Sequence, residues 1–168
     1  MRRSERKAMN VGIIADTHDN LPHIVRALEV FSRRGCQALI HAGDYVAPFA
    51  LKAVLEFPGK VYGVLGNCDG ELEGLRKLMP DLDVGPLNVQ IDSCRILVIH
   101  RRKRLTDADR AGVDVIVCGH SHQAKIIPGK PLVINPGECG GWLTGKCTVA
   151  ILDTQTLSAE LIVLGCES

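Results

Sequence analysis

The stretch NVGIIADTHDNLPHIVRALEVFSRRG, residues 10–35, contains a strand pattern, a polar loop and a helix pattern in direct succession. Residues 10–15 are mostly apolar, and we expect them to form a buried strand that ends at Asp16. Asn20 and Pro22 are typical of a helix start. One apolar face of this helix is predicted to consist of Ile24, Val25, Leu28, Val30 and Phe31. A buried strand followed by an amphipathic helix is the repeating unit of an α/β fold.

The same alternation continues through the first half of the chain. Strand patterns occupy residues 38–44 and 60–70, while helix patterns begin at Pro48 and span about 72–79. Repeated alternation of strand and helix predicts parallel βαβ units with right-handed crossovers.

The second half is richer in hairpin patterns. Residues 87–100 alternate between apolar and polar positions and then continue into an apolar strand. A short helical stretch at about 106–111 leads to a third apolar run at 113–118, and hairpin-like patterns follow at 124–135 and 147–164. We therefore expect two mixed sheets, flanked by helices, in one α/β fold.

The composition is that of an ordinary globular domain: 168 residues, 46% hydrophobic, with a formal net charge of +1. This balance gives no reason to expect a stable nucleic-acid partner or a membrane partner, and no apolar run approaches the roughly 20 residues of a membrane span. We expect a flexible basic tail at residues 1–9, without the apolar segment of a secretory signal, and one domain over residues 10–168. The seven cysteines include no CxxC pair, which favours a reduced, cytoplasmic setting.

Polar side chains of a few kinds follow the predicted strands where these end. In an open α/β sheet the carboxyl ends of the strands meet at one crevice, so side chains far apart in sequence can lie together there. The set comprises two aspartates, one asparagine and four histidines, namely Asp16, His18, Asp44, Asn67, His100, His120 and His122.

These donors suit divalent metal ions. Imidazole nitrogens with carboxylate and amide oxygens bind Mn²⁺, Ni²⁺, Fe²⁺, Co²⁺ or Zn²⁺, and we expect two ions, with Mn²⁺ the first choice. Asp44 is the best candidate to bridge them, because a carboxylate between two cations offsets their repulsion. A single DxH or GNxD is as readily a chance turn, and a lone histidine is usually only hydrogen-bonded. Five such pieces at five strand ends together favour a metal site.

The blocks occur in the order DTH (16–18), GD (43–44), GNCD (66–69), VIH (98–100), GHSH (119–122) and NPGE (135–138). With this ordered set the chain resembles the calcineurin-like metallophosphoesterases, in particular their small single-domain bacterial and archaeal phosphodiesterases. The resemblance implies a four-layer αββα sandwich of two mixed β-sheets flanked by helices, with a dinuclear site at one edge. It also implies that Asp44 bridges one ion held by Asp16, His18 and His122 and a second held by Asn67, His100 and His120.

The sequence departs from the family pattern in two places. Many members carry a histidine at the position of Cys68, where it is thought to protonate the leaving group. The small phosphodiesterases usually continue His100 as His-Gly-His, whereas Arg101 and Arg102 follow it here. The segment up to His120 is also about three residues shorter than in that branch.

The resemblance and the ligand set imply hydrolysis of phosphodiesters by a hydroxide that bridges the two ions. The residues expected to take part are Asp44, Asn67, Cys68, Asp69 and His100 in catalysis and Asn67, Arg101 and Arg102 in substrate binding. Cys68 could serve as general acid or simply fill space, and Asp69 is better suited to bracing its loop or a neighbouring histidine. The cationic run at 101–104 could clamp an anionic substrate or could be a solvated loop.

Four further residues are assigned supporting roles. Asn135 and Glu138 are expected to tune the site from outside the ligand set, His41 to be packed or to support a ligand, and Trp142 to pack or to contact another subunit. The expected substrate is a small phosphodiester or nucleotide. The apolar runs in the C-terminal hairpins could mediate a homodimer. A phosphomonoesterase and a non-catalytic interaction scaffold of the same fold, as in the retromer complex, are the alternatives.

Overall fold

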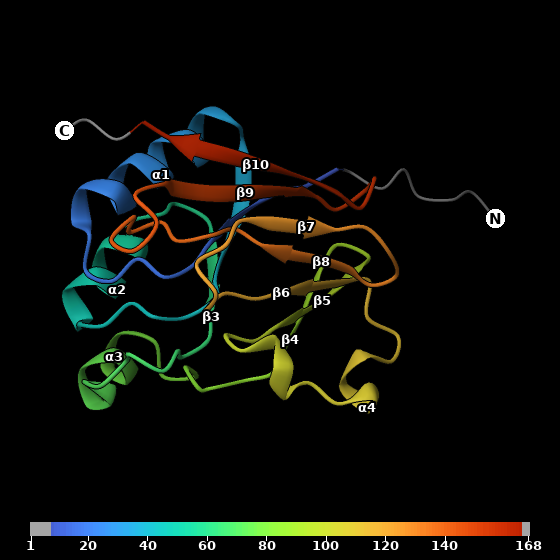
Figure 1. Ribbon diagram of the computed structural model, residues 1–168, viewed down its shortest axis with the longest axis horizontal. Coiled ribbons are helices and arrows are strands. Elements are labelled where there is room, and N and C mark those ends of the chain that lie inside the picture. The colour runs from blue at the N-terminus through green and yellow to red at the C-terminus, as the bar shows by residue number, and fades with distance from the viewer. Residues whose placement is uncertain (1–7, 166–168) are drawn as a thin grey trace.

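The computed structural model describes residues 8–165, which form two five-stranded mixed sheets with helices outside them (Figure 1). The first sheet, sheet A, has the strand order β10 (Ser158–Leu164), β9 (Cys147–Asp153), β1 (Asn10–Ile14), β2 (Cys36–His41) and β3 (Lys60–Gly63). The second, sheet B, has the order β4 (Leu87–Ile91), β5 (Cys94–Val98), β6 (Val115–Val117), β8 (Leu132–Asn135) and β7 (Lys125–Ile127). The prediction of two mixed sheets is confirmed.

Both sheets have a parallel centre and antiparallel strands beside it. In sheet A, β1, β2 and β3 are parallel to one another and β9 and β10 are antiparallel neighbours. In sheet B, β5, β6 and β8 are parallel, and β4 and β7 pair antiparallel at the two edges. The loops that leave the carboxyl ends of the parallel strands are therefore the ones that can form a shared site.

Three helices pack on the outer face of sheet A, namely α1 (Leu21–Arg33), α2 (Pro48–Val54) and α3 (Leu72–Leu78) (Figure 1). The first begins where the sequence predicted, because the side-chain oxygen of Asn20 accepts the backbone N–H of His23 at 3.3 Å. Its buried face consists of Ile24, Ala27 and Phe31.

One expectation about α1 was wrong. Val25, predicted on the apolar face, is 51% exposed, because the next residue along a helix lies about 100° around its axis from Ile24. Phe31 packs so closely on β1 that a Cβ on Gly12 would lie 2.8 Å from its ring. Glycine at this position therefore lets the helix approach the sheet.

The apolar core has three layers. The cluster between the sheets draws on β1, β2, β5, β6 and β8, with Ile13, Ile40 and Val117 fully buried. A second cluster lies between sheet A and its three helices. A third, smaller cluster with Leu97, Ile116 and Val133 lies on the outer face of sheet B.

The cover over sheet B is thin. It consists of the 3-10 turn η1 (Arg102–Arg104) and the single-turn helix α4 (Asp107–Arg110). Thr106 caps α4 by accepting the N–H of Asp109 at 3.2 Å, and the Asp109 carboxylate accepts the N–H of Thr106 in return. The order helices–sheet–sheet–helix is as expected, but the fourth layer is shorter than the helix predicted at 106–111.

The N-terminal boundary is anchored at Met9, whose N–H donates to Thr154 Oγ1 at 3.2 Å and whose carbonyl accepts the Thr154 N–H at 3.1 Å. The first seven residues of the predicted tail at 1–9 lie outside the described residues. Within residues 8–165, none of the helices combines the length and apolar character that crossing a membrane requires.

Candidate metal centre

The loops after β1, β2, β3, β5 and β6 bring all seven predicted ligands to one place. Gly43 has a φ of 97°, and a Cβ there would lie 2.8 Å from both the His100 ring and the Gly66 backbone, so glycine is required at this crossing. Five of the seven candidate ligands themselves have left-handed backbone conformations, namely Asp16, His18, Asp44, His120 and His122, with φ between 41° and 71°.

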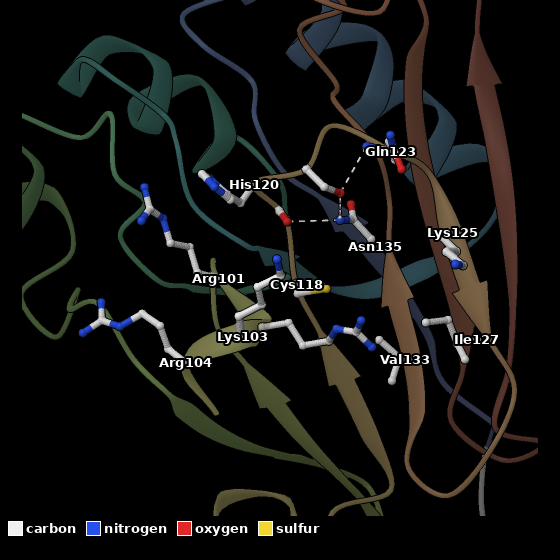
Figure 2. A pocket seen from close by; sticks show the side chains of 13 residues that line it. Arg101, Lys103, Arg104, Cys118, His120, Gln123, Lys125, Ile127, Val133 and Asn135 are labelled. Atoms are coloured by element: carbon white, nitrogen blue, oxygen red, sulfur yellow. Dashed lines mark hydrogen bonds between the residues drawn. The ribbon is translucent and has the colours of Figure 1, made fainter. Parts of the chain in front are cut away.

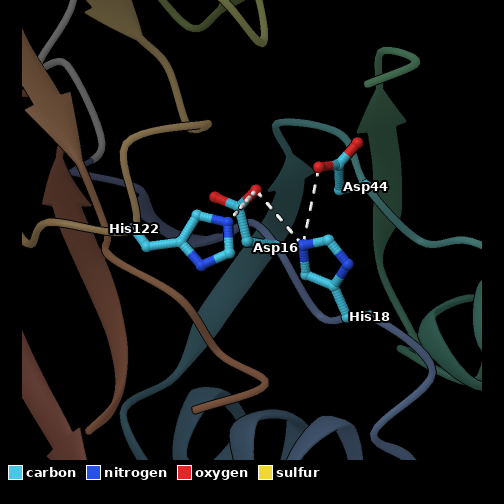
Figure 3. A group of neighbouring side chains, drawn as sticks. All are labelled: Asp16, His18, Asp44 and His122. Carbon is cyan, nitrogen blue, oxygen red and sulfur yellow. Dashed lines mark ion pairs between the residues drawn. The ribbon is translucent and has the colours of Figure 1, made fainter. Parts of the chain in front are cut away.

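The first group of donors consists of Asp16, His18, Asp44 and His122, whose ligating atoms all lie within 4.8 Å of one another (Figure 3). Asp16 Oδ1 is 3.5 Å from His122 Nε2 and 3.8 Å from His18 Nε2. His18 Nε2 is also 3.5 Å from Asp44 Oδ2.

The second group consists of Asn67, His100 and His120, and it also meets Asp44. Asn67 Oδ1 lies 3.0 Å from His100 Nε2 and 2.8 Å from His120 Nδ1. His100 Nε2 is 3.3 Å from Asp44 Oδ2, the same oxygen that faces His18. One carboxylate oxygen, Asp44 Oδ2, therefore lies between the two groups.

The protonation of His100 shows what this arrangement requires. Its Nδ1 is 2.7 Å from the carbonyl oxygen of Ala42, which can only accept, so Nδ1 carries a proton. In the neutral ring Nε2 then presents a lone pair to Asn67 Oδ1 and Asp44 Oδ2, which are acceptors too. A positive charge is needed among these three atoms, and it can come from a proton or from a metal ion.

Two buried atoms in the described part of the chain face the first group without a hydrogen-bond partner, Asp16 Oδ1 and His18 Nε2. Unpaired buried polar atoms are costly, and metal coordination would satisfy both. Carboxylate, amide and imidazole donors match divalent ions of the Mn²⁺ to Zn²⁺ series. The residues present therefore fit divalent metal ions.

Charged neighbours perturb the titration of these groups. Burial alone would raise the pKa of Asp44, but His100 and the backbone N–H of Cys68, at 2.8 Å from Oδ1, outweigh it and hold the pKa well below its usual range. Burial and then the charge of Arg101 lower the pKa of His120. The carboxylate and the exposed imidazole are thus both favoured in the deprotonated forms that bind metals.

Asp69 braces the loops around Asp44. Its carboxylate accepts the backbone N–H groups of Asp44 at 3.0 Å, Val46 at 2.7 Å and Gly66 at 2.8 Å. Burial raises the pKa of Asp69. These contacts direct both oxygens of Asp69 into the backbone, so the structure places this residue behind the converging donors and not among them.

His41 contacts the loop formed by residues 16–18 through Thr17. It is completely buried and stacks on Tyr45 with ring centroids 3.8 Å apart. Its Nδ1 accepts the N–H of Gly43 at 3.1 Å, and its Nε2 is 3.0 Å from Thr17 Oγ1. Burial, reinforced by the charge of His100, lowers the pKa of His41 to about 3, so the ring stays neutral.

Glu138 orients His122. Glu138 Oε2 is 2.6 Å from His122 Nδ1, which leaves Nε2 to face Asp16. Burial would raise the pKa of Glu138, but bonds from the backbone and hydroxyl of Thr144, and then His122, hold it below its usual range. Asn135 braces the adjacent GHSH loop by donating to the Gly119 carbonyl at 3.1 Å and Ser121 Oγ at 2.9 Å.

A cavity of about 510 Å³ opens directly above the donors. Cys68 and His120 line it with two exposed apolar side chains that the sequence did not assign to the site, Trp142 and Leu143, which are 66% and 77% exposed. Trp142 Nε1 donates to the His18 carbonyl at 3.0 Å, which ties the Gly-rich loop to the donors. A lone tryptophan in a Gly-rich stretch carried no signal for this position.

The predicted substrate contacts Arg101 and Arg102 lie on exposed backbone immediately after His100. Arg101 lines a second cavity together with His120, and Arg102 lines it too. Five of the seven candidate ligands line the first cavity together with Cys68, namely His18, Asp44, Asn67, His120 and His122. Asp16 and His100 are buried behind them, and the two arginines line the neighbouring cavity.

Two mixed sheets with carboxylate, amide and imidazole donors gathered at their carboxyl ends define the class of protein, a metal-dependent phosphoesterase. A model of the calcineurin-like phosphoesterase superfamily domain matches residues 9–157, and the chain belongs to this superfamily.

Individual relatives agree in length and fold. The chain is 36% identical over 165 residues to "Phosphodiesterase MJ0936" of Methanocaldococcus jannaschii, covering 93% of this chain and 99% of that protein. The structure described as a "novel archaeal phosphodiesterase" superposes with a TM-score of 0.82 at 36% identity, covering 93% and 100% of the two chains. Vacuolar protein sorting 29 from Cryptosporidium parvum, at 17% identity, a TM-score of 0.68 and coverage of 93% and 96%, shares the fold.

Proposed function

We propose that this protein is a phosphodiesterase that uses two divalent ions, Mn²⁺ foremost, with Asp16, His18 and His122 holding one, Asn67, His100 and His120 the other, and Asp44 shared. The observation that carries the proposal is the position of Asp44 Oδ2, 3.5 Å from His18 Nε2 and 3.3 Å from His100 Nε2. The similarity to an archaeal phosphodiesterase along nearly its whole length supports diester cleavage.

Bound ions would supply a bridging hydroxide at neutral pH and offset the negative charge that develops on the phosphoryl oxygens. The chain's own residues prepare the place for this chemistry. Cys68 N–H holds Asp44 Oδ1, so Oδ2 keeps its direction toward both groups. Glu138 and the Ala42 carbonyl fix the proton positions of His122 and His100, so each ring presents Nε2 to the centre.

The role of the remaining predicted catalytic residues follows from their contacts. We assign Asp69 to positioning the Asp44 and Gly66 loops, since its oxygens are occupied by backbone N–H groups. Burial, followed by the charge of Asp44, raises the pKa of the Cys68 thiol, which therefore stays protonated at neutral pH but is a weaker acid than a free thiol. We assign Cys68 to holding Asp44 through its backbone N–H, which donates to Oδ1 at 2.8 Å.

Metal analysis joined to turnover tests the proposal. The full chain loaded with Mn²⁺ should bind two ions and hydrolyse bis(4-nitrophenyl) phosphate faster than 4-nitrophenyl phosphate in the same buffer. Faster monoester turnover would make it a phosphomonoesterase. Folded protein with neither bound metal nor turnover would instead favour the interaction scaffold. The scattered cysteines of the sequence, with no CxxC pair among them, support the cytoplasm as the place of action.

A further inference from the structure

The proposed function leaves one cavity unexplained. It has a volume of about 640 Å³, lies on the outer face of sheet B and adjoins the candidate metal centre (Figure 2). His120, Ser121 and Gln123 line both this cavity and the one above the donors, so a single extended molecule can occupy both.

The cavity exists because the fourth layer of the sandwich is thin. Only the turn η1 and the one-turn helix α4 stand over this part of sheet B. The floor is apolar, with Cys118 and Val133 buried and Ile127 beside them. The floor can therefore pack against an apolar ring or chain.

The rim has the opposite character. No acidic side chain lines the cavity. The five cationic side chains that line it are Arg101, Arg102, Lys103, Arg104 and Lys125. Among residues 8–165, no carboxylate lies within ion-pair distance of any of the five. Figure 2 shows Arg101 and Arg104 on one side of the floor and Lys125 on the other.

The cations come from two separate segments, which a mere charged loop would not explain. Four follow His100 in sequence, but Lys125 lies on β7, where it shares a side with Ile127 because positions two apart on a strand face the same way. Arg102 and the floor residue Cys118 line the same cavity. The cationic groups thus surround the floor.

The two cavities differ in the arm of a phosphodiester that they can accept. The one above the donors has Trp142 and Leu143 on its wall and suits an apolar ester arm. From the cationic rim and apolar floor we infer that the sheet B cavity binds the other arm, and that this arm carries a second phosphate group. This inference rests on the proposed function and names its substrate class: phosphodiesters with one arm that bears an additional phosphate.

A matched pair of ligands tests the inference by binding alone. Thymidine 3′,5′-bisphosphate and thymidine 5′-phosphate differ by one phosphate. With Mn²⁺-loaded full chain, calorimetry should give a Kd about tenfold or more lower for the bisphosphate, with the difference shrinking as salt is added. Equal Kd values would overturn the inference whether or not the protein is an enzyme.

Variants locate the binding. Lys125→Gln and Lys103→Gln should each reduce the bisphosphate preference about threefold or more, whereas Lys130→Gln, on the same hairpin but outside the lining, should leave it unchanged. A preference that survives both lining substitutions would place the second phosphate elsewhere and overturn the assignment.

Turnover separates the inference from the proposed function. Thymidine 5′-(4-nitrophenyl phosphate) and its 3′-phosphorylated form should both be hydrolysed, with kcat/KM higher for the phosphorylated form through a lower KM. Binding preference without turnover of either ester would support the cavity assignment and overturn the phosphodiesterase. Turnover of both esters at equal kcat/KM would do the reverse.

Discussion

The two outer faces of the sandwich are built in different ways. Three helices cover sheet A, and the carboxylates of its loops, Asp16 and Asp44, are almost completely buried. Sheet B has only a turn and a one-turn helix over it, and its loops present the exposed His120 beside an open cationic cavity. Close packing on the sheet A side fixes the positions of the buried carboxylates. The sheet B side is open enough for a small molecule to bind.

Stability should therefore depend much more on the sheet A face. Phe31→Ala is expected to lower the free energy of unfolding by about 3–5 kcal/mol, because it empties a fully buried aromatic site beneath α1. Val133→Ala on the sheet B face should lower the free energy of unfolding by only about 1 kcal/mol. The substitution removes fewer atoms than Phe31→Ala does, and Val133 lies beside an open cavity. Urea unfolding of both variants measures the difference, and similar losses would break the comparison.

Removing the charge shared by the two groups should have the largest effect on function. Asp44→Asn is expected to reduce kcat/KM by about 10²–10³-fold and to lower the bound metal content, because one negative charge faces both sets of donors. Atomic absorption and diester turnover are the measurements. Unchanged metal content and rate would show that Asp44 is not the bridge.

The second largest effect on function is expected at Glu138, which contacts the candidate ligand His122. Glu138→Gln should weaken metal affinity by about 10–100-fold, because an amide holds the Nδ1 proton of His122 less strongly than a carboxylate does. Metal titration of the purified variant gives the affinity. Glu160→Gln, on an exposed ion pair with Arg34, is the control and should leave metal affinity as it is.

Acid should destabilise the sheet A side through His41. An unfolded imidazole has a pKa near 6.5, whereas burial lowers that of His41 to about 3, so the unfolded chain takes up a proton that the folded chain refuses. The stability that the neutral ring supports is present above about pH 6.5 and is lost as pH falls toward 3. The stability gap between wild type and His41→Gln should then narrow by up to about 1.4 kcal/mol per pH unit. Urea unfolding from about pH 7 to pH 5 measures it; a constant gap would contradict this account.

The smallest effect is expected at the mouth of the site. Cys68→Ala should change kcat for diesters less than about threefold, because the backbone N–H that holds Asp44 is retained. For a diester with an alkyl leaving group, loss of a general acid would instead cost about 10²–10⁴-fold, so steady-state kinetics on such a diester separate the two roles.

The sequence could predict most of the candidate site because the candidate ligands follow strands. Apolar runs that end in Asp16, Asp44 and His100 mark where parallel strands stop, and parallel strands must share an edge. The pairing of Glu138 with His122 was harder to foresee, since NPGE and GHSH belong to different loops and only the fold brings them together.

Other features depend on three-dimensional packing and left little trace in the sequence. The exposure of Val25 follows from the exact rotation of α1, which an apolar pattern defines only loosely. The cavity on sheet B depends on how short α4 is, and Lys125 joins its rim only through the pairing of β7 with β8. The sequence shows the cationic run after His100, but it does not show that Lys125 lies across the cavity floor from that run.

The left-handed backbone at Asp16, His18, Asp44, His120 and His122 limits how the centre can change. Aspartate, asparagine and histidine tolerate this conformation better than other side chains, and they are also good donors for divalent ions. Exchanging one of these donors for glutamate or cysteine would thus alter coordination and strain the loop as well. Few residue types can therefore replace these donors, and the main-chain conformation imposes that limit whether or not a metal ion is bound.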